Sequence, residues 1–156
     1  MRISLFVVGE TRTEYLRDGF DEYARRLRHF CTFRTVAVPG EKLKSEKSSG
    51  IVQAEEWRRI LKALPEQRHL IVLDRRGTQC TSNQLAERIQ DLQNRSIPEV
   101  CFAVGGPLGF PQEALRAADF VLSLSEMTFL HEMTRLILLE QLYRAFMILQ
   151  GGKYHK

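Results

Sequence analysis

The chain has 156 residues, of which 44% are hydrophobic and 27% are charged, as in a soluble globular protein with one domain and one core. The basic excess behind its net charge of +4 lies in the first half, which suggests an anionic partner such as RNA or, alternatively, a solvated surface. The N-terminal apolar run is too short for a signal peptide, and the three cysteines form no C-x-x-C pair. We therefore expect a cytoplasmic protein with reduced thiols and exclude export, a disulfide framework and a zinc site.

The first part of the chain predicts a strand and a helix. Residues 3–8 form an apolar run ended by Gly9, which is typical of a buried strand. Thr11 and Glu14 have the spacing of a capping box, and apolar side chains then recur at helical intervals as far as Leu27. The polar side of this helix carries four arginines that either face phosphate groups or form a solvated surface: Arg17, Arg25, Arg26 and Arg28.

A second strand and a second helix follow, separated by the most polar part of the chain. Residues 33–38 predict the strand, which a Pro-Gly pair ends. Residues 41–50 are a mobile loop or the frayed start of a helix, and their lysines are candidates for RNA contact. Apolar side chains at helical spacing between residues 51 and 64 predict an amphipathic helix that Pro65 ends.

The second half of the chain alternates strands with helices. Residues 69–73 predict a third strand, which opens into a polar turn at residues 74–77. A capping-box pair, Thr81 and Gln84, starts a helix that reaches Leu92. The remaining elements are a fourth strand, a short helix and a fifth strand, at residues 100–104, 111–118 and 120–124.

The fourth strand runs into a turn that contains Gly105, Gly106 and Gly109. Glycines let backbone N–H groups approach a ligand closely, and open α/β sheets bind ligands where strands end in such turns. The turn matches neither the G-x-G-x-x-G pattern nor the P-loop pattern of nucleotide sites. Alternatively, it starts a helix with Pro111 as the first residue and binds no ligand.

Five apolar runs separated by helices predict a parallel α/β sheet covered on both faces. If neighbouring strands run in the same direction, the strand ends at Leu73, Val104 and Leu124 meet at one edge. The last helix, residues 131–150, is apolar on almost every side, but charged residues interrupt it, so it is a poor transmembrane candidate. Because a helix with two apolar faces has to cover more than the sheet, we expect a homodimer.

Five motifs of the chain resemble those of the ribosomal large-subunit methyltransferase H (RlmH) family, which belongs to the SPOUT class. They are the strand ending in Val8-Gly9, VGGPLGF at 104–110, LSLSEMTFLH at 122–131, LEQLYRA at 139–145 and Tyr-His-Lys at 154–156. The resemblance covers essentially the whole chain and implies one SPOUT domain, residues 1–156. Its fold is a parallel five- or six-stranded α/β sheet with helices on both faces and a C-terminal trefoil knot, in a homodimer.

The activity that this resemblance implies is methylation of N3 of a pseudouridine in a stem-loop of large-subunit (23S) rRNA, within assembled ribosomes. The implied methyl donor is S-adenosylmethionine, and no metal is required. Carried over by position, the cofactor-binding residues are Leu73, Gly105, Leu124, Ser125, Glu126, Met127, Thr128 and Phe129. Their apolar side chains and the loop amides suit an adenine ring, whereas Glu126 either pairs with the cofactor or is an exposed loop carboxylate. Many relatives have proline where this chain has Leu130, so we expect a looser entry into the last helix.

Methyl transfer from a sulfonium mainly requires that the acceptor nitrogen is held in line, and the proton on N3 also has to leave. His155 is the candidate base, or orients the uracil ring; otherwise the terminus is a disordered polar tail. The candidate substrate-binding residues, by stacking or phosphate contact, are Tyr154, Arg135, Arg144 and Lys156. Arg144 has the alternative of pairing with Glu140, and we expect His131 to be a helix cap or a core residue. A catalytically inactive, knotted protein that binds ribosomes or RNA is the alternative function.

Overall fold

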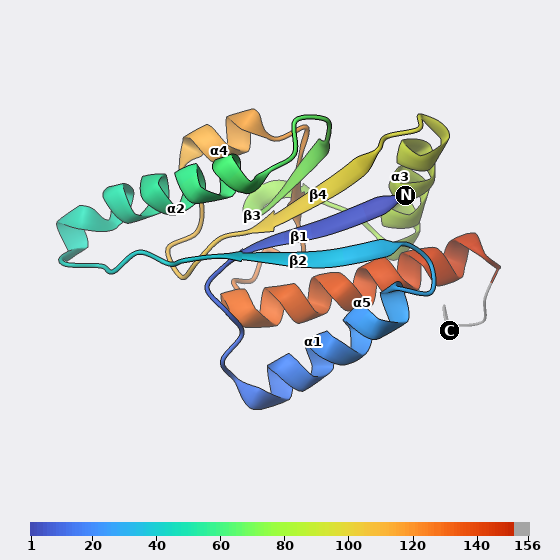
Figure 1. Ribbon diagram of the computed structural model, residues 1–156, viewed down its shortest axis with the longest axis horizontal. Helices are drawn as coiled ribbons and strands as arrows, with labels where there is room; N and C mark the ends of the chain where they lie inside the picture. Colours follow the sequence, from blue (N-terminus) through green and yellow to red (C-terminus); the bar gives the residue numbers. More distant parts are fainter. Residues whose placement is uncertain (152–156) are drawn as a thin grey trace.

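Five parallel strands form one sheet in the computed structural model, which describes residues 1–151 (Figure 1). The strands are β1 (Arg2–Val8), β2 (Thr32–Val38), β3 (His69–Gln79), β4 (Glu99–Val104) and β5 (Phe120–Ser123). Their order across the sheet is β2-β1-β4-β3-β5, so β4 is the central strand. The predicted parallel α/β sheet is confirmed, whereas the trefoil knot implied by the family resemblance stays a prediction.

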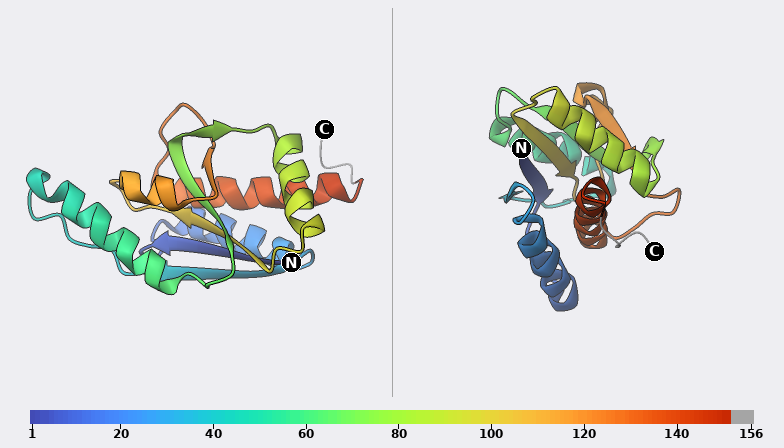
Figure 2. Two further views of the ribbon diagram at one scale, coloured as in Figure 1. Left: turned by 90° about the horizontal axis from the view of Figure 1, so that it is seen from above. Right: turned by 90° about the vertical axis from the view of Figure 1, so that its right-hand side faces the viewer.

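Helices cover both faces of this sheet (Figure 2). One face carries α1 (Glu14–Leu27), α3 (Ser82–Asn94) and α5 (His131–Leu149). The other face carries α2 (Ser49–Ala63), which the short 3₁₀ helix η1 (Glu46–Ser48) precedes, and α4 (Gln112–Ala117). Within residues 1–151, no helix combines the length and the apolar character needed to cross a membrane.

The core consists of two hydrophobic layers, one on each side of the sheet. In β1, Ile3, Leu5 and Val7 point towards α1, α3 and α5, while Phe6 and Val8 point towards α2 and α4. Parallel strands buried on both faces have nearly continuous apolar sequences, which is why the sequence reveals them. Burial of each such side chain stabilises the fold by about 1.5–3 kcal/mol.

The starts of two helices show where capping patterns succeed and fail. At α3 the predicted capping box is confirmed, because Thr81 Oγ1 accepts from the Gln84 amide and the Gln84 side chain accepts from the Thr81 amide. At α1 the expected box is absent, since the helix begins at Glu14 and its N-cap, Thr13, makes no side-chain cap hydrogen bond. The amides of Arg12 and Thr13 instead donate to Glu132 of α5, at 3.0 and 3.1 Å. A cap from so distant a residue has no local sequence signal.

β3 is longer than its apolar run predicts. Residues 74–77, expected to be a turn, belong to an irregular stretch of the strand, after which Thr78 and Gln79 pair with Leu122 and Ser123 of β5. A Cβ atom at Gly77 would lie 2.5 Å from the carbonyl oxygen of Val121, so any side chain here would strain the contact between β3 and β5. The polar extension of β3 thus forms part of the edge where the strands end.

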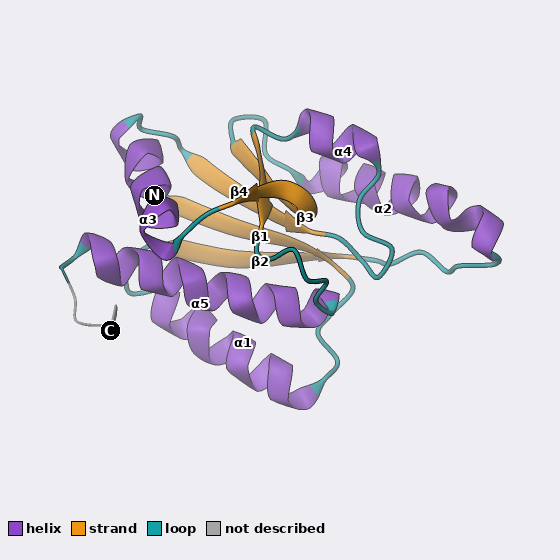
Figure 3. Ribbon diagram, turned by 180° about the vertical axis from the view of Figure 1, so that it is seen from behind, coloured by secondary structure: helices purple, strands orange, loops and turns teal. Residues whose placement is uncertain are grey.

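α5 lies between α1 and α3 and packs on the sheet; Figure 3 shows α1 and α5 side by side. Its buried side chains include Leu138, Leu142 and Phe146. On the α1 side, Leu136 packs against Gly19, where a Cβ atom would lie 3.0 Å from a Leu136 methyl group. Two neighbouring helices and the sheet therefore explain why this helix is apolar on several sides, and the homodimer stays a prediction.

Candidate functional site

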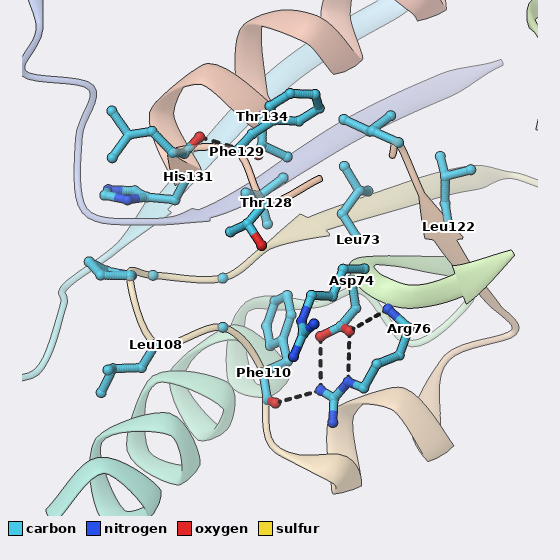
Figure 4. Close-up of a pocket in the computed structure, with 18 of the residues that line it drawn as sticks. Leu73, Asp74, Arg76, Leu108, Phe110, Leu122, Thr128, Phe129, His131 and Thr134 are labelled. Carbon is cyan, nitrogen blue, oxygen red and sulfur yellow. Dashed lines mark hydrogen bonds and ion pairs between the residues drawn. The ribbon is translucent and has the colours of Figure 1, made fainter. Parts of the chain in front are cut away.

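A pocket of about 850 Å³ lies at the carboxyl ends of β3, β4 and β5 (Figure 4). Leu73 pairs with Val104 on one side and with Leu122 on the other, so the three strand ends meet as expected. Residues 73–76, residues 104–112 and most of residues 122–131 form three of its walls, and Thr134 and Gln53 complete the lining. This edge is where open α/β sheets bind ligands.

The glycine turn after β4 is fixed in one conformation. Gly109 has a positive φ of 71°, and its amide donates to the carbonyl of Gly106 at 2.9 Å. A Cβ atom at Gly105 would lie 3.1 Å from the carbonyl carbon of Gly109, so the turn leaves little room for a side chain there. Behind the turn, Phe110 is buried and packs edge-on against Trp57, with ring centroids 5.8 Å apart. The turn is followed by α4, whose N-cap is Pro111 rather than its first helical residue.

Two side chains from other elements hold this turn. Gln53 of α2 donates to the carbonyl of Leu108 at 2.6 Å, and Arg76 donates to the carbonyl of Phe110 at 3.2 Å. Arg76 also pairs with Asp74 through two hydrogen bonds, Nε to Oδ1 at 2.8 Å and Nη2 to Oδ2 at 2.9 Å. The β3 extension and α2 therefore clamp the glycine turn from two sides.

Asp74 is the buried partner of this ion pair, with a side chain that is 8% exposed. Burial raises the pKa of its carboxyl group, but the hydrogen bonds from the Arg76 side chain and amide outweigh burial and lower it. The pair is therefore ionised at neutral pH. Sequence reasoning treated residues 74–77 as a polar turn and missed this clamp; the signal was the Asp-x-Arg-Gly string after a buried strand.

The loop between β5 and α5 carries most of the predicted cofactor residues. Its backbone is shaped by Ser123, which donates to the carbonyl of Ser125 at 3.0 Å, and by Ser125 Oγ, which accepts from the Met127 amide at 3.0 Å. The predicted residues that line the pocket are Leu73, Gly105, Leu124, Ser125, Met127, Thr128 and Phe129. Glu126 is exposed and is not among the lining residues, in line with the alternative of an exposed loop carboxylate.

The first turn of α5 brings His131 and Thr134 to the pocket. The expectation of a capping or core role for His131 is wrong, because Leu130 is the N-cap and His131 is half-buried in the pocket wall. Burial and, next, the charge of Arg135 lower the pKa of His131, so its imidazole is neutral at pH 7. Leu130 is 56% exposed at the pocket rim.

The prediction that Arg135 binds the RNA substrate is wrong. Its residue is 1% exposed, and its guanidinium donates to the carbonyls of Val8 at 2.6 Å and Gly9 at 3.1 Å and to Thr11 Oγ1 at 3.1 Å. A side chain committed in this way fastens α5 to the end of β1 and is not presented to an RNA phosphate. Helical periodicity cannot reveal these contacts, because the two backbone carbonyls and the hydroxyl that accept them lie more than 120 residues away in sequence.

The other predicted substrate residues divide into two groups. Arg144 pairs with Glu140 at 2.5 Å within α5, which is the alternative that the sequence offered. Tyr154, His155 and Lys156 lie outside the described residues. Among residues 1–151, no group of three or more His, Cys, Asp or Glu side chains is placed to hold a metal ion.

Comparisons with known proteins agree with this architecture. The family model described as "Predicted SPOUT methyltransferase" matches residues 1–155. The proteins named Ribosomal RNA large subunit methyltransferase H from Acetivibrio thermocellus and Halothermothrix orenii are 42% and 40% identical to this chain, each over 159 residues and 100% of both sequences. A solved structure of a probable methyltransferase from Bordetella pertussis Tohama I has a TM-score of 0.57 at 11% identity, covering 92% of this chain and 95% of that one, which shows the fold alone. The chain therefore belongs to the SPOUT methyltransferase family and, within it, to the ribosomal RNA large subunit methyltransferase H proteins.

Proposed function

We propose that this protein transfers a methyl group from S-adenosylmethionine to N3 of a pseudouridine in a stem-loop of 23S rRNA, within assembled ribosomes. The observation that carries the proposal is the pocket at the carboxyl ends of β3, β4 and β5. It occurs in a chain whose full-length relatives at 40–42% identity are named as methyltransferases of large-subunit ribosomal RNA.

The pocket suits S-adenosylmethionine in size and chemistry. Its volume of about 850 Å³ lies within the range of roughly 300–1,000 Å³ that is common for ligand pockets. Leu73, Leu122 and Phe129 offer apolar surface to an adenine ring, while the amides around Gly105 and Gly106 suit polar groups. When bound, S-adenosylmethionine supplies an electrophilic methyl group. The task of the chain's own residues is to orient the acceptor nitrogen and to exclude water.

A Gly105→Val substitution tests the cofactor pocket. Because even a Cβ atom at this position lies 3.1 Å from the Gly109 backbone, a valine displaces the turn or fills the pocket. We expect calorimetry to detect S-adenosylmethionine binding by the wild type and at least a hundredfold weaker binding by the variant. Gly50→Val, at a position where a Cβ atom meets nothing within 4 Å, is the control and keeps wild-type affinity. Unaltered affinity of the Gly105 variant would contradict the assignment.

The acceptor side of the reaction is assigned to the C-terminal residues. His155 takes the N3 proton or orients the uracil ring, Tyr154 stacks on the base and Lys156 binds a phosphate. We expect deletion of residues 154–156 to abolish methyl transfer and to leave S-adenosylmethionine binding intact. Full transfer by the truncated chain would exclude this role.

The RNA partner is supported by the exposed lysines between β2 and α2, which are Lys42, Lys44 and Lys47. Mass spectrometry of rRNA from a strain without this protein tests the substrate. We expect one pseudouridine of 23S rRNA to lose its methyl group, and added protein to restore it on ribosomes rather than on free rRNA. If no rRNA nucleotide loses a methyl group, and calorimetry finds no S-adenosylmethionine binding, the inactive ribosome-binding protein becomes the better description.

The location of the protein follows from its proposed action on ribosomes, and its assembly is inferred from α5. We propose that residues 1–156 act as one domain, that two chains form a homodimer through α5, and that the protein works in the cytoplasm, where ribosomes are. The dimer is supported by the apolar side chains of α5 that are left half-buried on the side away from the sheet, such as Met133, Ile137 and Met147.

A further inference from the structure

Glu56 is a buried carboxylate of α2 that lies directly behind the glycine turn. The residue is 4% exposed. A Cβ atom at Gly106 would lie 2.9 Å from its Oε2, and one at Gly40 would lie 3.6 Å from its Oε1. Both Cβ positions also approach Val8, at 3.3 and 3.5 Å from Cγ1. The carboxylate therefore lies where β1, β2 and β4 end, and glycines make room for it on two sides.

The two oxygens of this carboxylate have different environments. Oε1 accepts from the amide of Glu41 at 3.0 Å. Oε2 is buried and has no hydrogen-bond partner among the residues that the structure describes. The nearby cation, Arg59, donates to Glu41 at 2.5 Å and to the carbonyl of Pro39 at 2.8 Å. Burial raises the pKa of Glu56, against the opposing effects of the Glu41 amide and Arg59.

This arrangement does not suit a purely structural residue. An unpaired buried oxygen destabilises a fold, and the hydrogen bond from the Glu41 amide explains the presence of Oε1 but not that of Oε2. The group that Oε2 faces is Gly106, which lines the pocket together with Gly105. Gln53, one turn earlier on α2, holds the same turn through the Leu108 carbonyl at 2.6 Å. α2 thus meets the glycine turn at two points, through Gln53 in the pocket lining and through Glu56 behind the turn.

We propose that Glu56 is a positioning residue of the cofactor site. Its carboxylate fixes the position of Gly106 and therefore the position of the pocket wall that the glycine turn forms. It also connects this wall to Glu41, at the start of the segment that carries Lys42, Lys44 and Lys47. The role rests on the proposed function, because it assumes that the pocket binds S-adenosylmethionine. A Cβ atom at Gly106 would lie nearer to Glu56 Oε2, at 2.9 Å, than to Val8 Cγ1, at 3.3 Å, so the contact with Glu56 is the tightest that it makes.

A double-mutant cycle tests the proposal. Gly106→Ala places a Cβ atom against Oε2, and we expect it to weaken S-adenosylmethionine binding at least tenfold and to lower the thermal unfolding midpoint. Glu56→Asp withdraws the carboxylate by one methylene group and weakens binding about threefold. If the two effects were independent, the losses of affinity in the single variants would multiply in the double variant. We expect the double variant to bind at least fivefold more tightly than that product. Without ligand, its thermal unfolding midpoint should lie above that of Gly106→Ala.

Glu87→Asp is the matched control, since Glu87 is an exposed glutamate of α3, on the opposite face of the sheet from α2. It should bind like the wild type and show no coupling to Gly106→Ala. If Gly106→Ala does not fold, Glu56→Gln takes its place, with binding weakened at least fivefold at an unchanged unfolding midpoint. If the two losses of affinity simply multiply in the double variant, or if Glu56→Gln binds like the wild type, the role of Glu56 is overturned and the proposed function is not. A wild-type chain that binds no S-adenosylmethionine would instead overturn the proposed function.

Discussion

Glu132 and Arg135 lie one turn apart on α5, and both bind the segment that joins β1 to α1. Glu132 accepts from the amides of Arg12 and Thr13, while Arg135 donates to the carbonyls of Val8 and Gly9. The carboxylate thus accepts hydrogen bonds from backbone amides, and the guanidinium donates hydrogen bonds to backbone carbonyls. Together they fix the helix turn that brings His131 and Thr134 to the pocket.

Replacing Glu132 by glutamine tests this attachment through stability. The hydrogen bond from the Arg12 amide, together with those from Thr13, lowers the pKa of Glu132 from 4.5 to about 2. Because the folded-state pKa is lowered, the carboxylate stabilises the fold fully above about pH 4.5, and this contribution is lost as the pH falls towards 2. We expect urea unfolding at pH 7 to show a loss of about 1–3 kcal/mol in Glu132→Gln, and the difference from the wild type to shrink between pH 4.5 and 2. Glu10→Gln, at an exposed position, is the control, and an equal effect there would refute the assignment.

The pair of Asp74 and Arg76 makes a separate prediction about binding. In Asp74→Asn the side chain of Arg76 loses its charged partner, so its hold on the Phe110 carbonyl weakens. We expect the affinity for S-adenosylmethionine to fall about tenfold, which corresponds to about 1.4 kcal/mol, as measured by calorimetry. Asp91→Asn is the control, because it removes an exposed ion pair with Arg95, away from the pocket, and should leave the affinity unchanged. Equal affinities of the two variants would show that the clamp does not shape the pocket.

Among the elements, the apolar ones were predictable and the polar ones were not. The runs at residues 3–8 and 100–104 identify buried strands because both of their faces are covered by helices. The extension of β3 beyond Leu73 consists of polar residues that pair only with β5, so its strand character depends on a partner that is distant in sequence. The same holds for the cap of α1, whose carboxylate comes from α5.

The close approach of β3 to β5 can be tested at Gly77. A Cβ atom there would lie 2.5 Å from the Val121 carbonyl oxygen and 2.7 Å from its carbonyl carbon, and these backbone atoms cannot move aside as the end of a side chain can. We expect Gly77→Ala to lower the free energy of unfolding by about 1–3 kcal/mol. Gly50→Ala is the matched control, because its Cβ atom meets nothing within 4 Å on α2, and it should stabilise the protein by about 0.5–1 kcal/mol. Chemical denaturation measures both, and equal effects of the two variants would exclude a close approach at Gly77.

For the whole molecule, the sequence predicted that the strand ends meet at one edge of the sheet. It did not predict the hydrogen bonds between distant segments that hold this edge together. The pocket was expected from the ends at Leu73 and Val104 and from the loop at 124–129, and the structure brings all three together. Arg135 was assigned to RNA because a guanidinium can hold a phosphate, whereas this one is buried and binds backbone carbonyls. Pairings between segments this far apart have no periodic pattern in the sequence.

The proposed homodimer is a property of the whole molecule that its mass in solution can test. Sedimentation equilibrium should give twice the 18.1 kDa mass of one chain. Ile137→Glu places a charge on the side of α5 that faces away from the buried Leu138, Leu139 and Leu142, and we expect it to produce a folded monomer. Leu61→Glu, at an exposed apolar residue of α2, should remain a dimer. A wild-type protein that sediments as a monomer would contradict the proposal.

The packing of Trp57 on Phe110 has an optical consequence. The sequence contains one tryptophan, which is 1% exposed and lies 5.8 Å from the ring of a residue in the glycine turn. Its fluorescence therefore reports the surroundings of that turn without interference from a second indole. Any ligand that shifts Phe110 should change the emission of the unlabelled protein, so titrations can follow the pocket wall directly, with no dye attached and no residue replaced.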